Sequence, residues 1–458
     1  MNALYYLFFF LLALAPLVIF HELGHFWVAR LCGVKVLRFS VGFGKPIFSW
    51  IRGPDKTEWV VAMIPLGGYV KMLDEREGLV PHEDLSRAFN RQTLFKRAAI
   101  VAAGPVANLL VAVLIYCVLF MHGIPGFRAI VAEPKAQSAA ALAGFKKADQ
   151  LIAVDQIPTP TWQEVRWELL KKAVKKQTVE VSVLTESNQS ALRRLDLSGL
   201  DKESLQGNFI QDLGLSRFLP LGAPEIVALS EQGSAKRFGL QVGDVLLKID
   251  DQMIQSPEQA TQIIRHNANH ALQVVVKRSS AKAELTFTLT PDPFADPKTG
   301  QTVGRMGAAL QPEQALLAPY QVLQRYGPLD SLYEATLKTW DTALFSVQMM
   351  GKMLLGQVSL KNISGPISIA DYAGQSAQMG WMAFCHFLAI ISISLGILNL
   401  MPIPVLDGGH LLYYIVEFIK GSPVPLRIEE IGQKVGLFFL ISLMILALFN
   451  DVNRLLIG

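Results

Sequence analysis

Four long runs of apolar residues punctuate the chain, and each predicts a helix that crosses a lipid bilayer. They extend from about Ala3 to Cys32, Ala98 to Phe120, Met382 to Met401 and Val435 to Phe449. A membrane helix needs about 20 mostly apolar residues, so the short fourth run must borrow flanking residues. The first run lacks the basic leader and small-residue cleavage site of a signal peptide, so we expect it to be retained as a helix.

The stretch 127–310 is more polar, and it contains an internal repeat. Residues 143–149 (Ala-Gly-Phe-Lys-Lys-Ala-Asp) and 238–244 (Phe-Gly-Leu-Gln-Val-Gly-Asp) each precede a strand-like segment of alternating apolar positions. A helical segment follows each copy, at Thr161–Lys171 and at Ser256–His266. Each copy therefore predicts one module of strands and a helix.

The two copies resemble tandem PDZ domains, which we place at 127–220 and 221–310. PDZ domains bind an extended peptide by adding it to a sheet edge, although spacers or steric gates without peptide affinity are an equal alternative here. The rest of the chain then divides into a first membrane segment at 1–126 and a second at 381–458. The linker region at 311–380 between them contains an amphipathic stretch, which we expect along the outer membrane interface.

Lysine and arginine are concentrated between the first two apolar runs. Twelve of them lie from Arg30 to Arg97, whereas the first twenty residues carry no charged side chain. Short loops rich in these residues stay in the cytoplasm. We therefore expect this segment to be cytoplasmic, with both termini and the long stretch after the second run on the outer side.

Composition agrees with a membrane protein that carries some soluble mass. Hydrophobic residues make up 51% of the chain and charged residues 17%. The net charge of +4 is small, and no basic patch with interleaved aromatics is present, which argues against nucleic acid as a partner. The three cysteines, Cys32, Cys117 and Cys385, are too few and too widely spaced to predict a disulfide framework or a cysteine metal site.

The first apolar run contains the motif His21-Glu22-Leu-Gly-His25. On a helix, residues i and i+4 share one face, so both imidazoles can reach one metal ion. Glu22 is placed to act as the general base toward a water that zinc activates. A chance match is the alternative, but a charged residue at bilayer depth costs about 2.5–3.5 kcal/mol and normally faces a partner, a cavity or a metal.

A catalytic zinc usually has three protein ligands, so a third ligand is expected near another membrane run. The third run ends in Asn399-Leu-Met-Pro-Ile-Pro-Val-Leu-Asp407-Gly-Gly. The prolines cannot continue a helix, and irregular backbone at membrane depth is tolerated where it lines a cavity or is buried in protein. We expect Asp407 as the third ligand and Asn399 facing the site, although Asp-Gly alone is a common turn.

The paired motifs resemble those of the site-2 protease family of intramembrane zinc metalloproteases, and the resemblance covers essentially the whole chain. It implies zinc as the cofactor and cleavage of single-pass membrane proteins, such as anti-sigma factors after a first cut and remnant signal peptides. It also implies a role in an envelope stress response. Asn399 would contact substrate near the zinc. The implied location is a bacterial inner membrane, with periplasmic PDZ domains and termini and an active site toward the cytoplasm.

The segment Trp59–Met72 reads as strands and contains Gly67-Gly68-Tyr69-Val70. Substrate must be extended for hydrolysis, and extended backbone in apolar surroundings needs hydrogen-bond partners. In the family that the chain resembles, this region is a membrane-dipping β-hairpin whose edge pairs with substrate; an ordinary cytoplasmic hairpin is the alternative. The expected fold is an α-helical integral membrane protein with about four transmembrane helices, a membrane-associated β-hairpin and two PDZ domains of mixed α and β structure.

Several other polar residues leave alternatives open. Asn108 in the second run pairs either with the catalytic segments or with neighbouring backbone. His266 and His270 predict a solvated helix end rather than a metal pair, and His386 in the third run predicts helix packing. A metal transporter would need more polar groups across the apolar runs. A membrane-anchored PDZ scaffold would leave the histidine motif without a reason.

Overall fold

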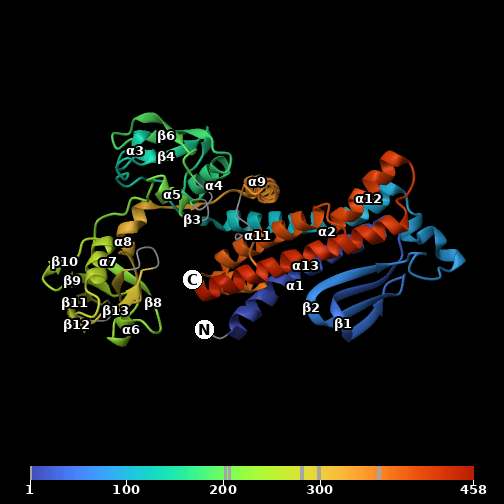
Figure 1. Ribbon diagram of the computed structural model, residues 1–458, viewed down its shortest axis with the longest axis horizontal. Coiled ribbons are helices and arrows are strands. Elements are labelled where there is room, and N and C mark those ends of the chain that lie inside the picture. The colour runs from blue at the N-terminus through green and yellow to red at the C-terminus, as the bar shows by residue number, and fades with distance from the viewer. Residues whose placement is uncertain are drawn as a thin grey trace. The chain divides into compact units, whose positions relative to one another are not determined.

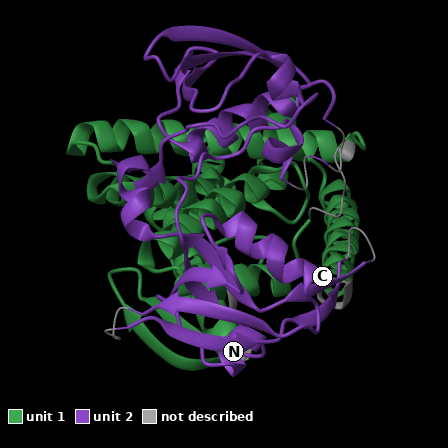
Figure 2. Ribbon diagram, turned by 90° about the vertical axis from the view of Figure 1, so that its left-hand side faces the viewer, with its two compact units in different colours: residues 1–124, 324–458 green, residues 125–323 purple. Residues whose placement is uncertain are grey.

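The structure is a computed structural model that describes residues 3–200, 204, 208–278, 283–296, 301–357 and 363–457. It divides into two compact units, which Figure 2 shows in different colours. The membrane unit comprises Met1–Ile124 and Gln324–Gly458, and the intervening unit comprises Pro125–Leu323.

Four helices of the membrane unit are long and apolar enough to cross a membrane. They are α1 (Ala3–Leu31), α2 (Leu94–His122), α11 (Trp381–Leu400) and α13 (Leu426–Ile457) (Figure 1). The four predicted runs are therefore confirmed as helices. The fourth helix begins well before Val435 and ends well after Phe449, because polar first and last turns lengthen its apolar centre. Helix α2 packs against both α1 and α11.

The described residues of the membrane unit also form the helices α9 (Pro328–Leu354), α10 (Pro366–Gln378) and α12 (Asp407–Lys420). The amphipathic stretch of the linker region belongs to α9, which packs against α2 and α11. Helix α10 packs against α1, and Asp451 of α13 caps its first turn. The carboxylate of Asp451 accepts hydrogen bonds from the backbone N–H groups of Gly365 (2.9 Å), Ile367 (2.9 Å) and Ser368 (3.1 Å).

A twisted sheet follows α1 and is built from two long, bent strands, β1 (Val36–Arg52) and β2 (Thr57–Met72). Residues 38–41 of β1 pair with 58–61 of β2 on one side and with 68–71 on the other. Bulges bend both strands, so the predicted hairpin is a sheet of four strand segments with residues 68–71 along one edge. The association of this sheet with a membrane stays a prediction.

The first half of the intervening unit is a four-stranded antiparallel sheet with its own buried core. The strand order is β5-β4-β6-β7, and α4 packs on the sheet. Apolar and polar residues alternate along β6, so one face of the strand lies on the core. Val179, Val181 and Val183 are buried, while Thr178 and Glu180 are exposed. The elements are α3 (Ala139–Leu142), β4 (Gln150–Val154), β5 (Ile157–Pro158), α4 (Trp162–Ala173), β6 (Thr178–Leu184), β7 (Ser190–Asp196) and α5 (Phe209–Asp212).

The second half is a six-stranded sheet with a separate core. Its order is β12-β11-β9-β8-β15, with β10 beside β9, and β13 and β14 form a pair of their own. The elements are β8 (Pro224–Leu229), α6 (Ser234–Arg237), β9 (Val245–Ile249), β10 (Gln252–Met253), α7 (Pro257–His266), β11 (Leu272–Lys277), β12 (Leu285–Leu289), β13 (Asp292–Ala295), β14 (Thr302–Arg305) and β15 (Ala308–Pro312). Shorter connecting elements are η1 (His82–Arg87), η2 (Phe89–Arg91), β3 (Ile124–Phe127), α8 (Gln314–Leu317), η4 (Ala318–Tyr320) and β16 (Gln321–Gln324).

The two glycine-aspartate turns of the intervening unit have the same construction. Asp149 and Asp244 are both buried, and each carboxylate accepts a hydrogen bond from the backbone N–H three residues earlier, at 3.0 Å and 2.8 Å. Each carboxylate also faces an arginine from a later part of its module, Arg193 or Arg278. A buried carboxylate needs such partners, which gives the sequence similarity a physical reason. The assignment of the two halves as PDZ domains stays a prediction.

Candidate metal centre

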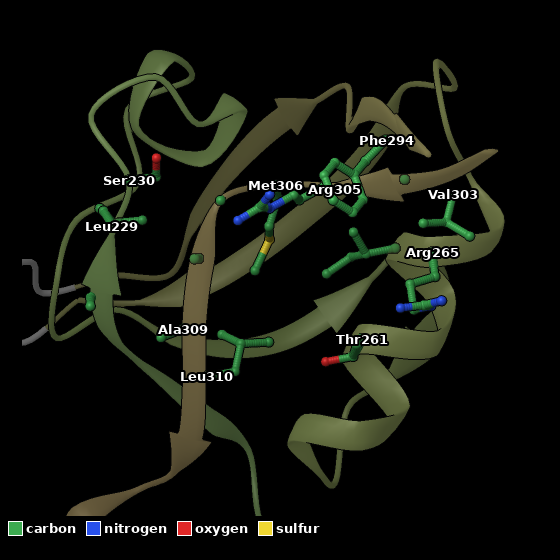
Figure 3. Close-up of a pocket in the computed structure, with 15 residues that line it drawn as sticks. Leu229, Ser230, Thr261, Arg265, Phe294, Val303, Arg305, Met306, Ala309 and Leu310 are labelled. Carbon is green, nitrogen blue, oxygen red and sulfur yellow. The ribbon is translucent and has the colours of Figure 1, made fainter. Parts of the chain in front are cut away.

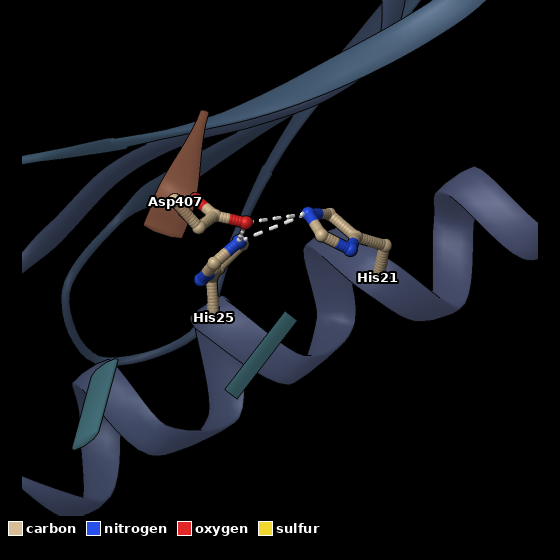
Figure 4. Close-up of side chains that lie close together, drawn as sticks. All are labelled: His21, His25 and Asp407. Atoms are coloured by element: carbon tan, nitrogen blue, oxygen red, sulfur yellow. Dashed lines mark hydrogen bonds and ion pairs between the residues drawn. The ribbon is translucent and has the colours of Figure 1, made fainter. Parts of the chain in front are cut away.

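Three predicted ligands meet in the membrane unit, although Asp407 is separated from the histidines by most of the chain. Figure 4 shows His21 and His25 on one face of α1, with the Asp407 carboxylate beside both rings. Oδ2 of Asp407 lies 3.2 Å from Nε2 of His21 and 3.5 Å from Nε2 of His25, and the two Nε2 atoms are 3.2 Å apart. Within the described ranges, no other group of three or more His, Cys, Asp or Glu side chains brings its ligand atoms this close.

The spacing of these atoms fits a bound zinc ion. Ligand atoms about 2.0–2.1 Å from a tetrahedral ion lie about 3.3–3.4 Å from one another, close to the separations seen here. Two imidazoles and a carboxylate are also a donor set of catalytic zinc sites, in which a fourth position is left for water or substrate. The residues therefore fit the metal that the sequence predicts.

The backbone of α2 orients His25. The Nδ1 of this buried ring lies 2.8 Å from the carbonyl oxygen of Ile100. A carbonyl only accepts, so Nδ1 carries the proton and donates it to Ile100. The lone pair then resides on Nε2, which faces His21 and Asp407 and is available to a metal.

Asn108, also on α2, lies against His21. Its amide Nδ2 is 3.3 Å from Nδ1 of His21, while its Oδ1 is buried without a hydrogen-bond partner. Rotating the amide by 180° brings the oxygen to His21, so that Nδ1–H donates to it and Nε2 is left for the metal. The hydroxyl of Ser392 on α11 holds the Asn108 backbone by donating to its carbonyl at 2.7 Å. Of the two alternatives for Asn108, the structure favours pairing with the catalytic segments.

Gly104 provides the room for both imidazoles. A Cβ atom at this position would lie 2.2 Å from Nε2 of His25 and 2.8 Å from Cε1 of His21. In the sequence Gly104 is only a glycine before Pro105 in the second apolar run, and its contact with the two histidines follows from the packing of α2 on α1.

The break after α11 delivers Asp407. Residues 401–406 are irregular, as the prolines predict, and α12 begins at Asp407 itself. Val405 has a φ of 94°, a region that β-branched residues almost never occupy, at a cost of about 1–3 kcal/mol. The surrounding packing holds this strained turn immediately before the ligand, which is a common way to preorganise a site.

Glu22 lies between the ligands and the edge of the sheet. A Cβ atom at Gly68 would lie 2.9 Å from Cγ of Glu22, so the edge segment passes directly over this side chain. Tyr69 and Val70 continue the edge: the Tyr69 hydroxyl accepts a hydrogen bond from Arg38 at 3.2 Å, and Val70 pairs with Phe39 of β1. The predicted base and the predicted substrate-binding strand are therefore neighbours.

Other predicted residues are placed as follows. Asn399 is half-buried in the last turn of α11, and no hydrogen bond joins it to the three ligands in the described part of the chain, so its contact with substrate stays a prediction. His266 and His270 each bond to a local backbone carbonyl on the exposed end of α7, which confirms a solvated helix end. His386 packs edge-on against Tyr116, as expected of helix packing. The three cysteines are free.

The intervening unit contains a groove that the sequence did not reveal. It has a volume of about 490 Å³ and lies between α7, the edge strand β15 and residues 303–307, which precede β15 (Figure 3). Its lining is mainly apolar and includes Ile264, Met306 and Leu310, with Arg265 and Arg305 at its margin. In the first half of the unit, the short helix α5 lies just before Gly214. The side chains of its Phe209 and Ile210 are buried in the core of that half.

Comparison with known proteins connects these features to a family. Residues 9–443 match peptidase family M50. The chain is 42% identical over 449 residues to the regulator of sigma-E protease RseP of Escherichia coli, covering 97% of this chain and 98% of the relative. It is 41% identical over 462 residues to a protein of Ralstonia nicotianae named "Putative zinc metalloprotease", covering 98% of each. A Vibrio cholerae protein of the same name is 40% identical over 448 residues.

These matches run through both membrane segments and the intervening unit, so they apply to the whole chain and not to one module. Four helices suited to a membrane and a cluster of two histidines and an aspartate agree with them. The chain therefore belongs to peptidase family M50, and it is a membrane-embedded metalloprotease of the site-2 type.

Proposed function

We propose that this protein uses zinc, held by His21, His25 and Asp407, to hydrolyse peptide bonds within the transmembrane segments of single-pass membrane proteins. The observation that carries the proposal is the convergence of three ligand atoms, with separations of 3.2–3.5 Å, from a membrane-spanning helix and the start of α12. The zinc in the names of two relatives agrees with this donor set.

Zinc bound here would supply a Lewis acid that activates water and polarises the scissile carbonyl. Glu22 accepts the proton of the attacking water and delivers it to the leaving amine, which fits its place beside the first ligand. Ile100 and Asn108 hold the two imidazoles in the tautomers that leave Nε2 free. These contacts support a site whose imidazoles are oriented before substrate arrives.

Substrate is proposed to bind as an added strand along residues 67–70 of β2. In the described part of the chain this edge pairs with β1 on one side only, so its other backbone groups can pair with an extended peptide. Gly68 lies against Glu22, which brings an edge-bound peptide toward the base. Asn399, at the end of α11, contacts the substrate backbone near the zinc.

The biological setting is proposed from the relatives. The name of the Escherichia coli relative refers to regulation of sigma-E. We infer that this chain acts in a bacterial inner membrane on anti-sigma factors after a first cut, and on remnant signal peptides, in an envelope stress response. The basic segment between α1 and α2 supports an active site toward the cytoplasm, with the intervening unit and both termini in the periplasm.

A second proposed activity is peptide binding by the second PDZ-like half of the intervening unit. The groove beside β15 carries this proposal, because it combines an apolar lining with a strand that, among the described residues, pairs on one side only. Replacing Thr261, which lies in this groove on α7, with Trp should abolish binding of an apolar-ended fluorescent peptide in a polarisation assay. Unchanged affinity would assign the module to steric exclusion instead.

The catalytic proposal is tested by comparing wild type with Glu22→Gln on a single-pass reporter in cells. Loss of the general base should slow cleavage about 10²–10⁴-fold, while the purified variant should retain about one zinc per chain. His21→Ala and Asp407→Ala should lose the zinc as well as the activity. Glu77→Gln, a substitution of the same kind in an exposed part of the membrane unit, is the control. Equal cleavage by wild type and Glu22→Gln would rule out Glu22 as the base.

A further inference from the structure

A two-point ion pair joins α2 to α12, the helix that begins at Asp407. Nη2 of Arg97 donates to Oε1 of Glu417 at 2.6 Å, and Nη1 donates to Oε2 at 3.2 Å. The guanidinium also lies over the ring of Tyr414, one turn earlier on α12, at 5.0 Å from its centroid. The Nε–H donates to the carbonyl of Gln92 at 3.2 Å, so the arginine is fixed at its base and at its tip.

This pair differs from the surface ion pairs of the same unit. The side chains of Arg97 and Glu417 are 14% and 16% exposed, whereas those of Arg91 and Glu75 are 51% and 32% exposed. Exposed pairs contribute little, because water screens them and their side chains must be immobilised. A bidentate, largely buried pair is geometrically specific, and removal of one partner leaves a buried charge without compensation.

The two helices that the pair connects carry different parts of the metal centre. Helix α2 bears the two groups that orient the histidines. The carbonyl of Ile100, one turn after Arg97, orients His25, and the side chain of Asn108 orients His21. Helix α12 bears Asp407 as its first residue. The position of the carboxylate relative to the imidazoles therefore depends on the position of α12 relative to α2.

No continuous helix connects α11 to α12, because residues 401–406 are irregular, so the direction of α12 is set by its packing as well as by the turn that precedes it. Ten residues separate Asp407 from Glu417, which corresponds to about 15 Å along a helix. Metal–ligand distances tolerate only about 0.2 Å, so a slide of α12 along α2 by about 1 Å would take Asp407 out of reach of an ion shared with the histidines. Because a helix slides as one body, the ion pair at Glu417 opposes that movement and holds Asp407 with it.

We propose that Arg97 and Glu417 are positioning residues, which hold α12 so that Asp407 completes the zinc site with His21 and His25. This inference rests on the proposed zinc site. A purely structural ion pair would stabilise the fold without affecting metal affinity or ligand geometry, and the two roles therefore predict different measurements.

The test uses the full-length chain in detergent. Zinc affinity is measured by competition with a chromophoric chelator, and ligand geometry by the visible absorption of the cobalt-substituted protein. Arg97→Ala and Glu417→Ala should each lower the zinc affinity about 10–100-fold and alter the cobalt spectrum. The double variant Arg97→Glu and Glu417→Arg, in which the two side chains are exchanged, should recover most of the zinc affinity and most of the wild-type cobalt spectrum. Arg91→Ala, which breaks the exposed ion pair with Glu75, should match wild type.

The outcomes separate this inference from the proposal on which it rests. If wild type and Asp407→Ala bind zinc alike, the zinc-site assignment itself is wrong. If Asp407→Ala loses zinc but Arg97→Ala and Glu417→Ala keep wild-type affinity and spectrum, only the positioning role is overturned. A failed recovery in the exchanged pair also overturns it. If the alanine variants do not fold, the test uses Arg97→Lys, which keeps the positive charge but cannot make the two-point contact with Glu417. The zinc affinity of Arg97→Lys must then be weaker than that of wild type for the inference to stand.

Discussion

Gly104 occupies a position where even one additional carbon would displace a metal ligand. Replacing it with alanine would bring a Cβ atom to 2.2 Å from Nε2 of His25. The rings cannot move far, because Ile100 and Asn108 hold them. Gly104→Ala should therefore lose most of its bound zinc and reduce proteolysis at least 100-fold, as measured by metal analysis and reporter cleavage.

The matched control is Gly351→Ala, since Gly351 also lies within a helix but a Cβ atom there would meet nothing within 4 Å. Alanine is the better helix former by up to about 1 kcal/mol. This variant should retain wild-type zinc content and cleavage. A Gly104→Ala protein with a full complement of zinc would contradict the packing described here.

The side chain of Asn108 contacts the ring of His21 without being one of the three proposed ligands. Asn108→Ala removes the side chain that orients His21 while leaving all three ligands in place. Loss of such an orienting partner typically costs 10–100-fold in metal affinity, so weaker zinc binding at normal expression is the expected result. Competition with a chelator measures it, and an unchanged affinity would mean that the Asn108 contact is incidental.

The cluster of His21, His25 and Asp407 was predictable from the sequence, whereas the residues that orient the two histidines were not. His21, Glu22 and His25 share a local helical spacing, and Asp407 follows a proline break that must be buried. Asn108 and Gly104 act through contacts between α1 and α2. These contacts depend on the rotation of each helix about its axis, which two uniformly apolar segments do not specify.

The edge segment of β2 lies against Glu22, the proposed base, through Gly68. Gly68→Ala would place a Cβ atom 2.9 Å from Cγ of Glu22 and 2.7 Å from the carbonyl oxygen of Ser40. We expect cleavage to fall at least tenfold with zinc content unchanged, because only the proton-transfer group and the substrate edge are disturbed. Zinc loss in this variant would show that the sheet also supports the ligands.

Hydrophobic patterning predicted the long helices but missed shorter elements. The four apolar runs were sufficient to predict the four long helices, because an apolar run of about 20 residues is the length that a helix needs to cross a bilayer. Helix α12 was not predicted, since Asp-Gly-Gly usually marks a turn. Here tertiary packing overrides that local preference and starts a helix at Asp407. The bulges that turn β1 and β2 into four strand segments likewise depend on pairing between distant residues.

The segment between α1 and α2 and the intervening unit are expected on opposite sides of the membrane. Leu79 lies in the basic segment between α1 and α2, and Glu186 lies in a turn of the intervening unit; both are exposed. In a chain whose three native cysteines are replaced, a membrane-impermeant thiol reagent added to the periplasmic side should label Glu186→Cys but not Leu79→Cys. Both should react after the membrane is opened. The reverse pattern would invert the proposed orientation.

The cap that Asp451 places on α10 has a consequence for how the protein is made. Synthesis proceeds from the N-terminus, so the histidines of α1 leave the ribosome long before Asp407, and α10 remains uncapped until Asp451 follows. Because α10 packs against α1, the helix that carries both histidines acquires its last support only near the end of translation. A nascent chain that has not yet reached Asp407 therefore lacks one of the three clustered side chains, so the proposed metal site cannot form while α1 and α2 are being inserted.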